Sequence, residues 1–233
     1  MDPIRLKHPL VLLCEGAADQ NFFRRLIERR TGYPPFNFLE PRDHHGVTAF
    51  GSMLRAIQGD QKGFSRLRGV LILADSAEDP QATFRHICDQ VRCAGAFPVP
   101  TAPGVIARPD PGANPGMPAL CIMLLPTDTQ PGGLETLCVE VLLGRYRWAR
   151  DCVESYLRCG QSNAHDWPTE RIDKARYHCL VAAIHRDDPS RAVSNAFGRS
   201  DGDRRPALID VTDSVFDEIA QRVRDFCAAV QGA

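Results

Sequence analysis

The chain has 233 residues, of which 43% are hydrophobic and 24% are charged. These proportions are typical of one soluble globular domain, or of a core domain with an appendage, and they exclude collagen-like, disordered and coiled-coil proteins. The 28 basic and 29 acidic residues give a formal net charge of −1, so no global positive field favours nucleic acid binding, although a local basic groove is compatible with this balance.

Three apolar runs, each followed by a turn and an amphipathic pattern, predict strand–helix units. The runs are residues 9–14, 69–74 and 119–125, and the helical patterns follow Gly16, Pro80 and Gly133. Continuous apolar runs of this length are typical of parallel strands that are buried on both faces. We therefore predict an α/β fold with a mostly parallel central sheet flanked by helices.

The rest of the sequence predicts a loop insertion and a helical C-terminal part. Residues 98–118 contain seven prolines and three glycines, so we expect a surface insertion of loop or edge strand there. Apolar stripes at helical spacing occupy residues 177–184 and 215–230. We expect a core of residues 1–145 and a mainly helical part of residues 146–233 that packs on the same domain.

The sequence shows no pattern typical of a membrane segment, a secretion signal or a disulfide framework. The apolar run 9–14 is far shorter than the roughly 20 residues of a membrane-spanning helix, and Glu15 and Asp19 interrupt it before a signal-peptide core can form. The nine cysteines include no CxxC pair, and most lie in apolar stretches. We therefore expect a cytoplasmic protein whose cysteines are small buried hydrophobic residues.

Acidic residues gather after the predicted strands. They are Glu15 and Asp19 after the first run, Asp75, Glu78 and Asp79 after the second, and Asp128 and Glu135 after the third. Ligand sites of open parallel sheets lie at the carboxyl ends of the strands, where these loops converge. Carboxylates gathered there repel one another unless a hard cation such as Mg²⁺ or Mn²⁺ binds, and such a site supports phosphodiester hydrolysis. The alternative is that these acids cap helices, which applies most to Asp79.

Several segments together resemble a known family. Residues 13–23, with Glu-Gly after a strand and an acid four residues after the Glu, resemble the first Toprim motif, and residues 71–80 resemble the second. Residues 124–135 resemble the Pro-Asp and Gly-x-Leu-Glu elements of small Toprim-like proteins related to the OLD (overcoming lysogenization defect) nucleases. Residues 173–178 and a predicted strand over 208–211 are also similar to that family.

The resemblance implies a Toprim-like sheet with a site for Mg²⁺ or Mn²⁺. It implies that Glu15 polarises the substrate or acts as a general acid or base, and that Asp75 binds metal. Asp19 and Glu135 would complete a second ion position. OLD-type nucleases also use a basic residue near the metals, which the resemblance assigns to Lys174; the alternative is an ordinary solvated lysine.

The sequence departs from the Toprim pattern at one position. Where that motif usually reads Asp-x-Asp, this chain has Asp75 followed by Ser76 and Ala77. Glu78 and Asp79 are the candidates to supply the missing carboxylate, but successive residues point in different directions. The departure keeps open a catalytically degenerate scaffold that binds a metal, a nucleotide or a protein.

Two further features have both a functional and a structural interpretation. His44 and His45 could bind metal or transfer protons, or they could belong to a loop before a helix. The first predicted helix carries a basic face, which suits a phosphate backbone but is also typical of a solvated helix surface. The residues of this face are Arg24, Arg25, Arg29 and Arg30.

We therefore predict a Toprim-type, Mg²⁺-dependent nuclease that acts on DNA or RNA. The first alternative is the degenerate scaffold. The second is a subunit that contacts a larger protein partner such as an ATPase, because OLD-type Toprim domains work beside ATPase modules and this sequence contains no Walker A motif. We expect no membrane partner.

Overall fold

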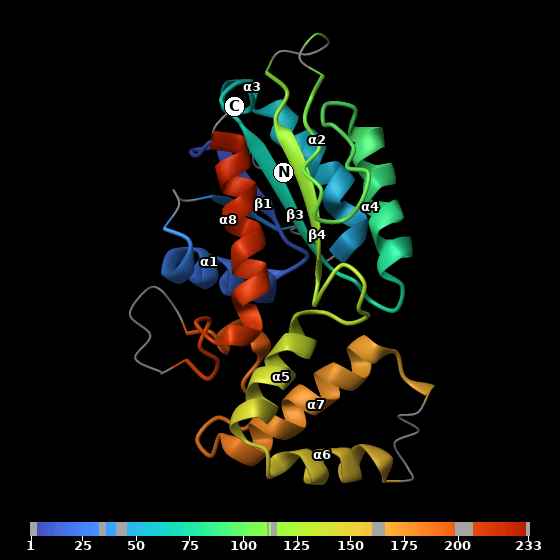
Figure 1. Ribbon diagram of the computed structural model, residues 1–233, viewed down its shortest axis with the longest axis vertical. Coiled ribbons are helices and arrows are strands. Elements are labelled where there is room, and N and C mark those ends of the chain that lie inside the picture. Colours follow the sequence, from blue (N-terminus) through green and yellow to red (C-terminus); the bar gives the residue numbers. More distant parts are fainter. Residues whose placement is uncertain are drawn as a thin grey trace.

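The computed structural model describes residues 4–32, 36–40, 46–110, 112, 116–159, 166–198 and 207–231. Four parallel strands form one sheet in the order β2-β1-β3-β4, and helices cover both of its faces (Figure 1). The predicted α/β fold with a parallel central sheet is confirmed, and the arrangement is consistent with a Toprim-like fold.

The elements have the following bounds. The strands are β1 (Leu10–Leu13), β2 (Asn37–Leu39), β3 (Gly69–Asp75) and β4 (Ala119–Leu125). The helices are α1 (Ala17–Arg30), α2 (Phe50–Gly59), α3 (Gln61–Phe64), α4 (Pro80–Ala94), α5 (Leu134–Arg145), α6 (Ala149–Arg158), α7 (Thr169–Ile184) and α8 (Asp217–Gln231). Short 3-10 turns span Gly46–Ala49, Val193–Asn195 and Ser214–Phe216.

The central strands are apolar on both faces because each face packs against helices. Alternate residues of β1 and β3 belong to two separate apolar clusters, as expected for the two-residue period of a strand. Leu10, Leu12, Leu71 and Leu73 pack with residues of α1 and α8, whereas Val11, Leu13, Val70 and Ile72 pack with residues of α2 and α4. Figure 1 shows these two helix pairs on opposite sides of the sheet.

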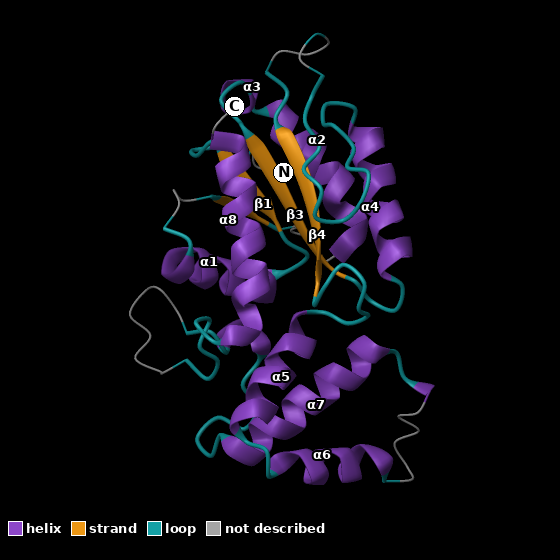
Figure 2. Ribbon diagram, in the orientation of Figure 1, coloured by secondary structure: helices purple, strands orange, loops and turns teal. Residues whose placement is uncertain are grey.

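The C-terminal half divides into a helical group and a helix that returns to the sheet. Figure 2 shows α5, α6 and α7 beyond the carboxyl ends of β3 and β4, while α8 lies along the sheet. At the start of β3, a Cβ on Gly69 would lie 2.8 Å from Phe226 of α8, so the helix packs directly on the strand. Residues of α5 to α8 share one apolar cluster with β1, β3 and β4.

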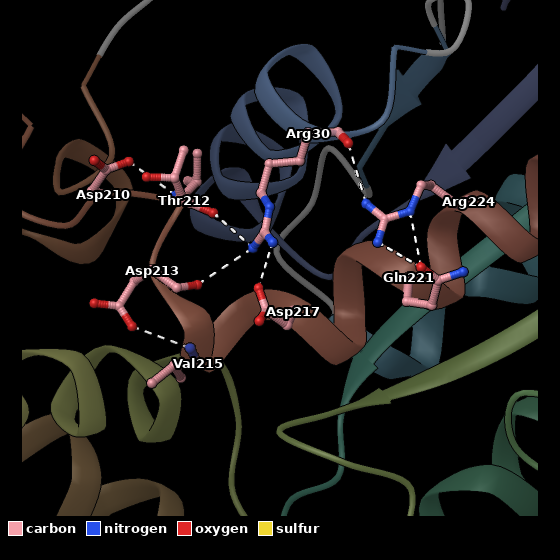
Figure 3. A network of polar contacts seen from close by, with 9 residues as sticks. Arg30, Asp210, Thr212, Asp213, Val215, Asp217, Gln221 and Arg224 are labelled. Carbon is pink, nitrogen blue, oxygen red and sulfur yellow. Dashed lines mark hydrogen bonds and ion pairs between the residues drawn. The ribbon is translucent and has the colours of Figure 1, made fainter.

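Polar contacts fasten α8 and the segment before it to the end of α1 (Figure 3). The guanidinium of Arg30 donates to the carbonyls of Val211 and Asp213, at 3.4 Å each, and forms an ion pair with Asp217. In the opposite direction, Arg224 of α8 donates to the carbonyl of Arg30 at 3.2 Å. These contacts give a structural role to one arginine of the predicted basic face.

Two segments outside the four strands make backbone hydrogen bonds that define their conformation. The predicted strand over 208–211 is wrong: Leu208 and Ile209 are buried, but their N–H groups both donate to the carbonyl of Ala196, at 2.8 and 3.1 Å, in an irregular turn. Part of the insertion 98–118 lies along the outer edge of β4, where Ala107 of the insertion and Leu120 of the strand exchange backbone hydrogen bonds of 2.8 and 2.9 Å.

The expectation for the cysteines is confirmed at five positions, which are Cys14, Cys88, Cys121, Cys138 and Cys227, all buried. Cys179, in an apolar stretch, is only half-buried, and the expectation is wrong for Cys93, Cys152 and Cys159, which are exposed. Within the described ranges, the helices are too short or too polar to cross a membrane. The predicted roles of His44 and His45 fall outside the described residues.

Candidate metal and phosphodiester site

Four acidic residues lie together at the carboxyl ends of two neighbouring strands. Glu15 follows β1 and Asp75 ends β3, while Asp19 and Glu135 occupy the first turns of α1 and α5. Oε1 of Glu15 accepts a hydrogen bond of 2.8 Å from the backbone N–H of Asp75. Oδ1 of Asp75 accepts one of 3.1 Å from the backbone N–H of Leu134, at the start of α5. We call these four acids the carboxylate site.

Burial raises the pKa of all four carboxyl groups, and repulsion from other acids of the site adds to the shifts of Glu15, Asp19 and Asp75. Burial, and then the charge of Asp19, raise the pKa of Glu15 to about 7. Burial, and then the charge of Glu135, raise the pKa of Asp19 to about 7. The pKa of Asp75 rises because of burial and the charges of Asp19 and Glu15, and the pKa of Glu135 rises because of burial. A bound cation would reverse this repulsion.

Lys174 of α7 brings a positive charge to the same place. Its ammonium forms an ion pair with Glu170, one helical turn earlier. The charge of Lys174 acts to lower the pKa of Glu15 and of Glu135, against the effect of burial. Burial alone would lower the pKa of Lys174, but the hydrogen bond to Glu170 and the charge of Glu135 raise it. The lysine is therefore a protonated cation beside the carboxylate site.

The loop after β3 shows what occupies the position of the missing second aspartate. Ala77 has a φ of 52° and exchanges backbone hydrogen bonds of 3.0 and 2.8 Å with Gly132. The next residue, Glu78, accepts hydrogen bonds from the backbone N–H and, at 3.3 Å, from the hydroxyl of Thr169. Because Thr169 begins α7, the carboxylate of Glu78 caps the helix that carries Lys174.

Two other predicted acids have structural partners. Oδ1 of Asp79 accepts a hydrogen bond of 3.0 Å from the N–H of Ala82, so Asp79 is the N-cap of α4. Asp128 forms an ion pair with Arg222 of α8, and its Oδ1 accepts from the N–H of Leu124 at 3.3 Å. Among the predicted metal ligands, the structure therefore brings together the four acids of the carboxylate site and gives Asp79 a separate capping role.

A chain of hydrogen bonds that the sequence did not reveal joins α5, α6 and α7. The hydroxyl of Thr136 accepts from the N–H of Gly133 at 3.1 Å and donates to buried Asp173 at 2.6 Å. Asp173 pairs with Arg176 at 3.1 Å, and Arg176 pairs with Glu154 of α6 at 2.8 Å. This chain fixes the start of α5, which contacts Asp75, against the helix that carries the lysine.

The composition of the carboxylate site fits a hard divalent cation. All the donors are carboxylate oxygens, which Mg²⁺ and Mn²⁺ prefer, and their raised pKa values are of the kind that a cation lowers. In the part of the chain that the structure describes, no three or more Asp, Glu, His or Cys side chains are already grouped as ligands of one ion.

The glycine at the start of α5 leaves room for the carboxylate of Asp75, which gives a first prediction. A Cβ on Gly133 would lie 2.4 to 2.5 Å from the carboxylate atoms of Asp75. We expect Gly133→Ala to displace Asp75 and to reduce the free energy of unfolding by about 1–3 kcal/mol, as overpacking does. Thermal unfolding followed by circular dichroism measures this loss.

Gly16 provides the matched control for that prediction. It precedes α1 as Gly133 precedes α5, both glycines have extended backbones, and a Cβ on Gly16 meets nothing within 4 Å. We expect Gly16→Ala to change the melting temperature little. Equal melting temperatures for the two variants would contradict the close approach of Asp75 to the start of α5.

Comparison with known proteins identifies a family whose description states no function. A family model described as "Protein of unknown function (DUF3226)" matches residues 9–225, which include the whole carboxylate site and Lys174. No curated protein and no solved structure matches the chain.

Proposed function

Since the chain belongs to the DUF3226 family, whose description states no function, we propose from the carboxylate site that it is a cytoplasmic nuclease of the Toprim type, related to the OLD nucleases, that hydrolyses DNA or RNA with Mg²⁺ or Mn²⁺. One observation carries the proposal: four carboxyl groups with raised pKa values meet at the carboxyl ends of parallel strands, with a lysine beside them. Such a gathering of like charges is costly to the apoprotein and suits a cation-dependent reaction.

Each residue of the site has a definite role in this proposal. Glu15 and Asp75 hold the cation, which when bound would polarise the phosphodiester and neutralise its charge. Asp19 and Glu135 serve a second ion position. In the metal-free protein the pKa of Glu15 is about 7, so this carboxyl group is partly protonated near neutral pH and would release its proton when the cation binds. The ammonium of Lys174 faces the same region and offers its charge to a phosphate oxygen.

The proposal is tested by incubating the purified protein with plasmid DNA, single-stranded DNA and RNA. We expect cleavage of at least one of these substrates with Mg²⁺ or Mn²⁺, and none after the cation is removed with EDTA. Cleavage that persists in EDTA would contradict a role for the carboxylate site as a cation site. The comparison of substrates also decides between DNA and RNA.

The position of Lys174 leads to a second prediction. We expect Lys174→Gln to reduce the cleavage rate about 10- to 100-fold, because the transition state loses a positive charge near the phosphate. Arg92→Gln is the matched control, since Arg92 is an exposed cation of α4 paired only with its neighbour Asp89 in the described part of the chain. An equal effect of both changes would show that Lys174 contributes only overall charge.

One observation favours a second candidate function, a scaffold without catalysis. The position of the second aspartate is held by Ala77, and the acids that follow it, Glu78 and Asp79, cap α7 and α4. In this alternative the protein binds a metal, a nucleotide or a protein partner such as an ATPase. Stabilisation by Mg²⁺ without cleavage of any nucleic acid would favour the scaffold over the nuclease.

A further inference from the structure

Two adjoining cavities form a cationic groove at the amino-terminal end of the sheet. Their volumes are about 560 and 660 Å³, and Arg66 and Arg68 line both of them. Figure 1 shows this end of the sheet near α3 and the last turn of α8, whereas Asp75 of the carboxylate site ends β3 at the other end of the strands. The basic residues that line the groove are Lys7, His8, Arg66, Arg68 and Arg108. We call it the amino-end groove.

The positive charge of this groove is not cancelled by its walls. None of the described residues that line the two cavities is acidic. Arg66 donates to the backbone carbonyls of Lys62 and Leu6, at 3.2 and 3.4 Å, and Arg108 donates to that of Ala229 at 2.7 Å. Neutral carbonyls thus orient two guanidinium groups and leave their charge available to an anion.

The charge of Asp60 interacts with that of Arg66, but the carboxylate of Asp60 is hydrogen-bonded to backbone N–H groups. Its two carboxylate oxygens accept hydrogen bonds from the N–H of Leu6 at 2.7 Å and of Gly63 at 3.1 Å. Asp60 therefore holds the N-terminal segment against α3 and forms no ion pair with Arg66 among the described residues. The groove keeps an excess of positive charge in a protein whose formal net charge is −1.

Another arginine-lined cavity lacks this excess and serves as a comparison. It has a volume of about 450 Å³ and lies at the ends of α1 and α5, where Arg25, Arg29 and Arg145 line it together with Asp210. Arg25 there forms an ion pair of 3.1 Å with Glu28. A polyanion would meet a carboxylate in this cavity, whereas it meets only cations and neutral groups in the amino-end groove.

We infer that the amino-end groove binds the phosphate backbone of a nucleic acid, without reading its sequence. A row of exposed cations without acids is the electrostatic requirement for backbone binding. The choice of nucleic acid over other polyanions rests on the proposed nuclease function. The groove is a separate surface, and it binds without a metal.

The two ends of β3 give the distance between the groove and the carboxylate site. Arg68 directly precedes this strand and Asp75 ends it. Seven residues at about 3.3 Å each separate the two sites by roughly 23 Å, which a duplex covers in about seven base pairs. A nucleic acid longer than this can be anchored in the groove while another part of it reaches the carboxylate site.

The inference is tested by measuring the affinity of the protein for labelled nucleic acids by fluorescence anisotropy in EDTA. The probes are single-stranded DNA, duplex DNA and RNA, each about 30 nucleotides long per strand. We expect Arg66→Gln/Arg68→Gln to weaken binding at least tenfold at low salt. The slope of log affinity against log salt should fall by about 1.4 to 1.8, since each lost phosphate contact removes about 0.7 to 0.9. The matched control is Arg25→Gln/Arg29→Gln, which should bind within about twofold of the unmodified protein.

Further variants and probes keep the outcomes distinct. Lys7→Gln/Arg68→Gln leaves the backbone contacts of Arg66 intact and should also weaken binding. Unchanged affinity in both groove variants, or an equal loss in the control, would overturn the inference. So would stronger binding to phosphatidylglycerol vesicles than to DNA at equal phosphate concentration. Because binding is measured without metal, the two proposals can fail separately. If the protein binds nucleic acid through the groove but never cleaves it, only the nuclease proposal is overturned. If the protein cleaves nucleic acid and the groove variants bind normally, only the inference about the groove is overturned.

Discussion

Replacing Glu15 by Gln or Asp75 by Asn is expected to reduce cation-dependent cleavage at least about 100-fold, because changes even to the partners of metal ligands commonly cost 10- to 100-fold. Both substitutions keep the size of the side chain and an oxygen that can accept the existing hydrogen bond, from the N–H of Asp75 or of Leu134. The charge that binds the cation is lost, while the local fold is kept. Initial rates of plasmid or oligonucleotide cleavage measure the effect.

The matched control for these substitutions is Asp89→Asn. Asp89 is an exposed acid of α4 that pairs with Arg92 and lies outside the carboxylate site. We expect this variant to cleave at close to the normal rate. If the Glu15 and Asp75 variants both remain as active as the Asp89 variant, the carboxylate site is not the site of the reaction.

The burial of Glu15 and its repulsion by Asp19 predict that Glu15→Gln stabilises the metal-free protein at high pH. The pKa of Glu15 is about 7 in the folded protein against 4.5 for the ordinary group, so the native state binds more protons between these values. Stability is therefore lost as the pH rises through this window, and the cost is fully present above pH 7. At about pH 8 in EDTA, we expect the variant to gain on the order of 2 kcal/mol, or roughly 4–8 °C in melting temperature.

Two comparisons control this prediction. The gain should shrink as the pH falls toward 4.5 and disappear below it, where the carboxyl group is protonated in both states and resembles the amide. Mg²⁺ should raise the melting temperature of the unmodified protein at pH 8 more than that of the variant, because the variant lacks a ligand. Equal melting temperatures of the two proteins across this range would contradict the repulsion within the carboxylate site.

The central sheet could be predicted because its strands are buried on both faces. Continuous apolar runs gave β1, β3 and β4 to within a residue or two at each end. β2 was not predicted, since its three residues, Asn37–Leu39, are half-buried and carry no apolar run. A strand was wrongly predicted over 208–211 because this segment has buried apolar side chains. The N–H groups of Leu208 and Ile209 donate to the carbonyl of Ala196 in a turn, and not to a neighbouring strand.

The carboxylate site could be predicted in part because strand ends meet at one edge of a parallel sheet. That rule brought Glu15 and Asp75 together from positions sixty residues apart. The rule does not distinguish an acid that caps a helix from one that binds a metal. Asp79 was therefore grouped with the predicted metal ligands, although its carboxylate caps α4. The proline after Asp79 was the available signal, because Pro is favoured in the first turn of a helix.

The position of Lys174 and of its helix α7 depends on tertiary contacts that the sequence pattern does not predict. Glu170 and Lys174 are spaced for an ion pair on one helix, which a local pattern can reveal. The contacts that orient this helix are between distant residues: Glu78 caps its start, and Thr136 binds Asp173. No local rule predicts such pairs, and they are what place the lysine beside the acids.

An anomalous difference map from a crystal of the protein soaked in Mn²⁺ tests the proposed cation site. We expect a peak at the carboxyl ends of β1 and β3, with carboxylate oxygens of Glu15 and Asp75 about 2.0–2.2 Å from it and Asp79 still capping α4. An ordered carboxylate site without a peak, or with Mn²⁺ bound only elsewhere, would contradict the claim that these acids form a divalent-cation site.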